Sequence, residues 1–149
     1  HRASPACGAA PRSSPAGWDA TAIDFSPAAV ERARAITGQW SDRVVEADFF
    51  AYEPVTGLDM IYERAFLCAL PRTMWPQVAK RWGQLLAKGG VLAGFFFFDD
   101  APKGPPFGIS REELDRLLVE DFECVEDADV ADSIPVFAGK ERWMKWVRK

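Results

Sequence analysis

The apolar run at residues 91–98, which reads VLAGFFFF, constrains the fold of this chain more than any other segment. Gly89 and Gly90 precede the run and are expected to end a helix, while Asp99 and Asp100 mark its carboxyl end. A run of this kind is typical of a strand buried on both faces, as in a parallel sheet covered by helices. It is far shorter than the roughly 20 residues that a membrane-spanning helix needs. The run therefore predicts an α/β fold.

Segments with strand and helix patterns alternate before this run. Ser26 and Pro27 supply a capping hydroxyl and a first-turn proline for a helix, and Gly38 is placed to end it. The inner side of this helix is expected to carry Ala29, Val30, Ala33 and Ile36. The expected strands cover residues 20–23, 43–47 and 58–62, and the expected helices cover residues 27–36 and 71–88. This alternation predicts a mostly parallel sheet covered on both sides.

The carboxyl-terminal third has weaker patterns. Residues 101–109 contain three prolines and two glycines and are expected to form a loop. Ser110 and Glu113 have the spacing of a capping box, which predicts a short helix to about Val119. Residues 122–126 and 141–147 are expected to be strands, although the second segment also suits a helix.

Composition narrows the class of protein. With 149 residues, of which 48% are hydrophobic, the chain suits one domain with a core. Its net charge of −4, with both signs mixed along the chain, lacks the basic surface expected of a nucleic-acid or anionic-membrane binder. Three cysteines without paired spacing argue against a disulfide framework and a metal motif, and for a reducing compartment. We expect a cytoplasmic protein with a small-molecule partner.

Charge appears abruptly at Glu63 and Arg64, directly after the apolar strand at residues 58–62. In open α/β sheets, ligands bind outside the carboxyl ends of the strands, where these two side chains are expected to lie. The alternative is a solvated ion pair beside a turn.

Three motifs occur in the order typical of one enzyme family: GWDATAIDFS at residues 17–26, LDMIYERAFLCAL at residues 58–70 and GPPF at residues 104–107. Through them the chain resembles the thiopurine methyltransferase-like proteins, which include thiopurine, thiol and halide methyltransferases. The resemblance implies a Rossmann-like class I methyltransferase sheet with an antiparallel strand near the carboxyl terminus. It also implies S-adenosylmethionine as the cofactor and a small thiol, thiopurine or halide-type methyl acceptor.

The resemblance implies a cofactor site at two strand ends. It places Asp24, followed by Phe25, where the family binds the ribose, and a carboxylate there accepts hydrogen bonds from ribose hydroxyls. It places Asp48 near the adenine amino group and the ring of Phe49 against the base. The alternatives are that Asp24 is a turn residue before a helix, and that Phe49 and above all Phe50 belong to the core.

Arg64 and Phe107 match family positions that border the methyl acceptor, where Arg64 would stabilise an anionic or thiolate group. Methyl transfer from a sulfonium depends mainly on positioning and on the exclusion of water. No dedicated catalytic base is therefore expected.

The chain departs from the family at the Gly-rich turn that follows the first strand. Residues 4–15 read SPACGAAPRSSP, and their prolines argue against a central strand. We expect residues 1–16 to be irregular or disordered and residues 17–149 to form an incomplete methyltransferase-like domain. Residues 58–62 and 95–98 would then be poorly covered, which predicts self-association and weak or no cofactor binding.

Two other functions stay open on the sequence alone. The chain could be a truncated, non-catalytic fragment of such an enzyme with little or no cofactor binding. A nicotinamide dehydrogenase is a more distant alternative, because no Gly-x-Gly-x-x-Gly motif precedes Asp24.

Overall fold

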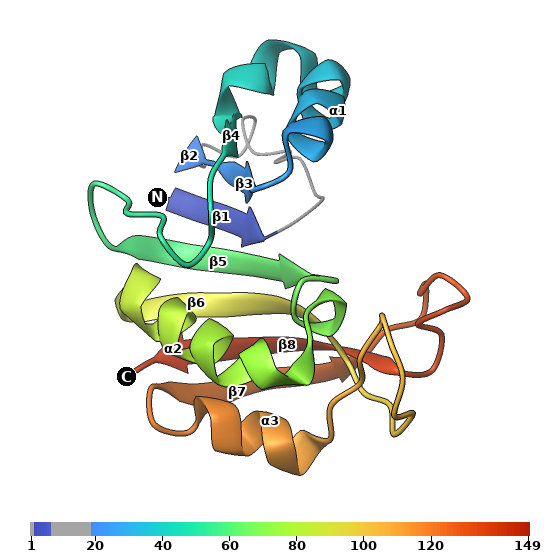
Figure 1. Cartoon of the computed structure of the whole chain (residues 1–149). Coiled ribbons are helices and arrows are strands. Elements are labelled where there is room, and N and C mark those ends of the chain that lie inside the picture. Colours follow the sequence, from blue (N-terminus) through green and yellow to red (C-terminus); the bar gives the residue numbers. More distant parts are fainter. Residues whose placement is uncertain (1, 7–18) are drawn as a thin grey trace.

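Eight strands form one sheet in the computed structural model, which describes residues 2–6 and 19–149 (Figure 1). The strands are β1 (Arg2–Ala6), β2 (Asp19–Ala20), β3 (Ala22–Asp24), β4 (Val44–Glu46), β5 (Leu58–Arg64), β6 (Leu86–Phe97), β7 (Phe122–Asp129) and β8 (Glu141–Arg148). The α-helices are α1 (Pro27–Thr37), α2 (Trp75–Leu85) and α3 (Arg111–Leu118). The 3-10 turns are η1 (Gly38–Arg43), η2 (Leu67–Ala69) and η3 (Arg72–Met74).

The strand order is β4-β3-β1-β5-β6-β8-β7, and β2 pairs with β1 beside β3. The pairs from β4 to β6 are parallel, whereas β8 runs antiparallel to both β6 and β7. The predictions of a mostly parallel sheet and of an antiparallel carboxyl-terminal strand are confirmed. The segment that also suited a helix is the strand β8.

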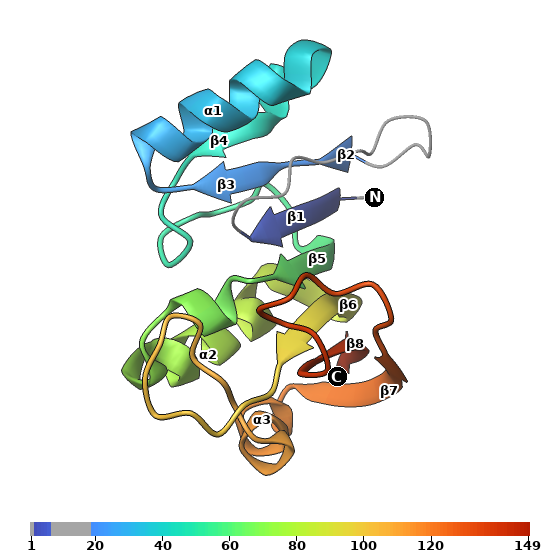
Figure 2. The ribbon, with the colours of Figure 1, turned by 90° about the vertical axis from the view of Figure 1, so that its right-hand side faces the viewer.

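The main core lies where α2 and α3 pack on β5, β6 and β8. The apolar face of α2 repeats at helical spacing and consists of Trp75, Val78, Ala79, Trp82 and Leu85, all buried. It meets Ile61, Leu92, Phe96 and Met144 from the strands and Leu114 and Leu118 from α3. Figures 1 and 2 show α2 and α3 side by side on one face of the sheet.

At the other end of the sheet, α1 packs on β3 and β4 around a small core of Ala22, Val30 and Val44. The Ser26 hydroxyl caps α1 by accepting from Ala29 N–H, and Gly38 ends the helix, as predicted. The prediction that Ile36 faces inward is wrong, because its side chain is 83% exposed. Within residues 2–6 and 19–149, the helices are too short and too polar to cross a membrane.

The prediction that residues 1–16 contribute no central strand is wrong, because β1 lies between β3 and β5. Its pairing with β5 is continuous over residues 3–6, with Pro5 opposite Tyr62. On the other side, pairing occurs at Arg2 and Ala3 with β2 and at Ala6 with β3, and skips Ser4 and Pro5. A proline is tolerated where a ladder is already interrupted, because its missing donor is not needed there. Residues 7–16 lie outside the described residues.

The glycines before the apolar run do not end a helix. Instead, α2 ends at Leu85, and both glycines belong to β6. Gly89 has a φ of 83°, and the β5–β6 register shifts between the pairs Leu58–Leu86 and Met60–Val91. The irregular part of this ladder needs a residue with positive φ. Glycine adopts such a φ without strain, because it has no Cβ atom.

The apolar segments expected to be poorly covered are buried in part, because Met60, Tyr62, Phe95 and Phe98 are half-buried. Leu58, Ile61, Phe96 and Phe97 each lie in the interior, where β1 and β8 flank β5 and β6 in the sheet and α2 packs on their face. These four side chains therefore offer little exposed apolar surface for self-association. Self-association of the protein stays a prediction.

Two apolar truncations on helices distinguish core from surface. Leu114→Ala should lower the free energy of unfolding by about 2–5 kcal/mol, because its side chain is fully buried between α2 and the sheet. Ile36→Ala should change it by less than about 0.5 kcal/mol, because this side chain lies in solvent. Urea unfolding followed by circular dichroism measures both values, and equal losses would contradict the assignment of the core.

Candidate active site

The carboxyl ends of β1, β3, β4, β5 and β6 all lie along one edge of the sheet, because these strands are parallel. Figure 1 shows the arrowheads of β1, β3 and β5 pointing the same way. From β1 the strand order continues to β3 and β4 on one side and to β5 and β6 on the other. Such a reversal of strand order is where open α/β sheets bind ligands. The predicted site residues follow these strands.

Asp24 is the last residue of β3 and is half-buried. Its Oδ1 accepts from the Ser26 N–H at 2.9 Å, which orients the carboxylate at the start of α1. Its carbonyl accepts from the Ala47 N–H at 2.9 Å and so ties the end of β4 to the end of β3. Phe25 follows with 75% of its side chain exposed. An oriented carboxylate and an open aromatic ring thus stand together at one strand end.

Asp48 lies two residues after β4 and is exposed. Its Oδ1 accepts from the Phe50 N–H at 2.9 Å, and its carbonyl accepts from Ala51 and Tyr52. These bonds form a tight turn around the aspartate. The link from Ala47 to Asp24 brings this turn next to the first carboxylate.

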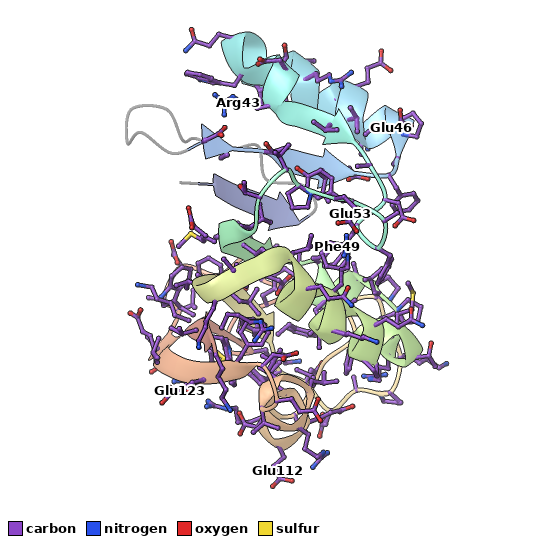
Figure 3. The ribbon with its side chains drawn as sticks, turned by 90° about the vertical axis from the view of Figure 1, so that its left-hand side faces the viewer. Arg43, Glu46, Phe49, Glu53, Glu112 and Glu123 are labelled. Carbon is purple, nitrogen blue, oxygen red and sulfur yellow. The ribbon has the colours of Figure 1, made fainter. Side chains whose placement is uncertain are left out.

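Phe49 is only 8% exposed and lies on the loop after β4, beside the α2 part of the molecule (Figure 3). Its ring meets Phe50 and Phe66 edge-on, at centroid distances of 5.2 and 4.9 Å. The alternative that both rings belong to the core is confirmed for Phe49, which is buried, while Phe50 is half-buried and packs against the same core. Phe49 therefore forms part of the wall below the strand ends.

Glu63 does not form a solvated ion pair. It is 2% exposed, and its Oε1 accepts from the N–H groups of Phe66 at 2.7 Å and Leu67 at 3.2 Å. Burial raises the pKa of Glu63 to about 7, the two backbone bonds oppose that rise, and the nearby Glu141 adds to it. The chain reverses at Ala65, which has a φ of 57°. Glu63 thus caps the turn that follows β5.

Arg64, the last residue of β5, is exposed and lies over an aromatic ring. Its Cζ is 4.5 Å from the centroid of Phe95 on β6, a cation–π distance. Phe95 in turn contacts Tyr62 and Trp143, with centroids 6.4 and 5.1 Å away. The guanidinium is thereby held over an aromatic ring at the end of β5.

Phe107 is tied to the turn after β5. Its N–H donates to the carbonyl of Cys68 at 2.7 Å, so the loop at residues 101–109 lies against η2. Its ring centroid is 5.4 Å from Cζ of Arg72, which begins η3. Phe107 packs against the core on the α2 side of the sheet, whereas the ring under Arg64 belongs to the group of Tyr62, Phe95 and Trp143. The structure links Asp24 and Asp48 through the ends of β3 and β4.

Two arginines contact these loops, and neither of them was assigned to the site from the sequence. Arg72 donates to carbonyls of the loop at residues 101–109, and Arg81 donates to carbonyls of the loop after β4. Arg81 does carry a signal, because a charged residue stands among the apolar positions of α2. Arg72 carries none, since its partners lie 29 to 36 residues away.

A family model for thiopurine S-methyltransferase (TPMT) matches residues 5–149. The chain belongs to this family. A probable thiol methyltransferase 2 of Arabidopsis thaliana is 30% identical over 133 residues, which are 83% of this chain and 58% of that protein. A thiopurine S-methyltransferase of Vibrio campbellii is 41% identical over 77 residues, or 50% of this chain and 35% of that protein. The matched part of the chain thus spans 58% of the length of the first relative and 35% of the length of the second.

Solved structures agree on the fold. The N-methyltransferase NodS of Bradyrhizobium japonicum WM9 has a TM-score of 0.77 at 19% identity, over 99% of this chain and 85% of NodS. The glycopeptide N-methyltransferase MtfA has a TM-score of 0.74 at 13% identity, over 99% of this chain and 81% of MtfA. This chain therefore has the class I methyltransferase fold.

Glu63 should make the fold less stable as the pH rises. Its pKa in the folded state is about 7 and its ordinary value is 4.5, so between these values the folded protein binds more protons than the unfolded chain. Stability then falls with rising pH, by on the order of 1 kcal/mol per pH unit, and levels off above about pH 7. Glu63→Gln retains an acceptor for Phe66 and Leu67 but removes this titration. Unfolding free energies of both proteins from pH 4.5 to 8 should diverge, and parallel curves would contradict the assignment.

Proposed function

We propose that this protein transfers a methyl group from S-adenosylmethionine to a small thiol, thiopurine or halide-type acceptor. Membership of the thiopurine S-methyltransferase family supports the class of reaction. The observation that carries the proposal is that Asp24 and Arg64 end the two strands that flank β1, at the reversal of strand order. One strand end thus offers an anion for ribose hydroxyls, and the other offers a cation for an anionic acceptor.

The described residues fit the ribose and adenine parts of the cofactor. The Asp24 carboxylate is already oriented by the Ser26 N–H, so it can accept from ribose hydroxyls without first being ordered. Asp48 is exposed at the next strand end and can accept from the adenine amino group. Phe25 is open enough to lie against the base, while Phe49 closes the wall from inside. The segment that would approach the methionine part, residues 7–18, lies outside the described residues.

The acceptor side combines a cation with an apolar surface. Arg64 presents an exposed guanidinium above Phe95, which suits a thiolate or a halide ion. The half-buried ring of Phe107 adds apolar area that can exclude water from the acceptor. When bound, S-adenosylmethionine supplies an electrophilic methyl carbon on a sulfonium sulfur. The protein's own part is to hold the acceptor in line with that carbon.

The structure offers no support for Glu63 as a base. Its contacts are structural, because the side chain is 2% exposed and its Oε1 accepts from the N–H groups of Phe66 and Leu67. A non-catalytic relative of these enzymes is the alternative, and cofactor binding separates the two. In the proposed enzyme, S-adenosylhomocysteine binds; in the alternative, it does not.

Asp24→Ala should weaken S-adenosylhomocysteine binding by at least about 10-fold, because a charge-assisted hydrogen bond is worth about 1.5–3 kcal/mol. Isothermal titration calorimetry measures the dissociation constant. The matched control is Asp42→Ala, which removes an exposed carboxylate from η1 and should change it by less than about twofold. Equal affinity of the parent and Asp24→Ala would refute the ribose assignment.

Arg64→Met and Phe107→Ala should raise the KM for the acceptor by about 10-fold or lower kcat, while S-adenosylhomocysteine affinity stays within about twofold. The assay follows formation of S-adenosylhomocysteine with 6-mercaptopurine, thiophenol and iodide as separate acceptors. Arg64→Met should affect the ionic acceptors most, because it removes the cation but keeps an apolar stem over Phe95. A loss of cofactor binding in either variant would move that residue out of the acceptor site.

A further inference from the structure

Arg81 is a buried cation that bonds the loop carrying Asp48 and Phe49. It projects from α2 and is 8% exposed. Its Nε donates to the carbonyl of Phe49 at 3.1 Å, and one terminal nitrogen donates to the carbonyl of Tyr52. The same nitrogen lies 3.4 Å from Oε1 of the exposed Glu53, which Figure 3 shows on the same loop as Phe49. A buried guanidinium requires such partners.

Arg72 makes the equivalent contacts to the loop that carries Phe107. It stands at the start of η3, directly before α2. Its terminal nitrogens donate to the carbonyls of Ala101 and Pro102, each at 2.9 Å, and to Gly108 at 3.1 Å. These carbonyls lie on both sides of the residues 104–107, so one side chain bonds the two ends of the loop. Its Cζ also lies 5.4 Å from the ring of Phe107.

The two arginines share one rigid support. The indole of Trp75, the first residue of α2, donates to the carbonyl of Leu67 at 3.0 Å and is 1% exposed. The arginines therefore extend from a segment fixed in the core, whereas their partners belong to loops. A guanidinium has five donors in a fixed plane and can bond several carbonyls at once, which a lysine ammonium on a flexible stem does not reproduce.

We propose that Arg72 and Arg81 are positioning residues that hold the two sides of the site independently. Arg81 fixes the cofactor side through the loop at residues 48–53, and Arg72 fixes the acceptor side through the loop at residues 101–109. This assignment rests on the proposed function for the meaning of the two sides. The physical claim underneath it, that each side chain orders one loop, concerns the protein alone.

Arg81→Met and Arg72→Met test the proposal in the full chain. Arg81→Met should weaken S-adenosylhomocysteine binding about 10-fold, because misplacing a binding group by about 1 Å is costly. Arg72→Met should leave that affinity within about twofold and raise the acceptor KM about 10-fold, with 6-mercaptopurine as acceptor. Arg72→Lys and Arg81→Lys should restore only part of each loss. The controls are Lys80→Met, the exposed neighbour of Arg81, and Arg116→Met, an exposed arginine on α3.

Amide hydrogen exchange, read by mass spectrometry, supplies a second measurement that needs no ligand. Arg81→Met should speed exchange in residues 48–53, where Tyr52 N–H donates to Asp48, and leave residues 101–109 unchanged. Arg72→Met should do the reverse, and Phe107 N–H, which donates to Cys68, is the amide to follow. Faster exchange in both loops of each variant, or in neither, would overturn the proposal. If the parent binds no S-adenosylhomocysteine, the proposed function fails while the exchange result still decides whether each arginine orders one loop.

Discussion

The two hydrogen bonds accepted by the buried Glu63 carboxylate fix the end of β5, and the rest of the site is built outward from that end. They satisfy the N–H groups of Phe66 and Leu67, which are the first donors of a short turn and lack partners within it. The carbonyl of Leu67 then accepts from the indole of Trp75. This bond ties the first residue of α2, whose apolar face packs on the sheet, to the turn after β5, and α2 in turn carries Arg81.

The two arginines beside this helix differ in how their charge is balanced. Arg81 lies 3.4 Å from the Glu53 carboxylate, whereas among the described residues the polar partners of Arg72 are carbonyls alone. Carbonyl dipoles solvate a guanidinium without cancelling its charge. Arg72 therefore keeps a positive charge beside the ring of Phe107. On the proposed function, this sign suits an anionic acceptor, and the proposed cofactor side carries the carboxylates of Asp24 and Asp48 instead.

How much of this could be predicted from the sequence depends on the range of the interactions. Local patterns predicted the alternation of strands and helices, the cap at Ser26 and the charged end of β5, because neighbouring residues decide these features. The proline rule failed at Pro5, since tolerance depends on which ladder of β1 is interrupted, and that is a property of two other strands. Helical spacing failed at Ile36 because α1 covers too little of the sheet to bury it. Arg72 stayed unrecognised because its bonds join residues about 30 apart.

The burial of Glu63 also bears on the chemistry that the proposed enzyme can perform. A carboxyl whose pKa is raised to about 7 is a candidate base by that value alone. Its contacts point to a structural role, because the side chain is 2% exposed and its Oε1 accepts from two backbone N–H groups that begin η2. On the proposed function, the acceptor arrives already ionised, and Arg64 stabilises the anion. Acceptors that are anions at neutral pH, such as halides and thiols of low pKa, fit this site better than alcohols or amines, which would need a base.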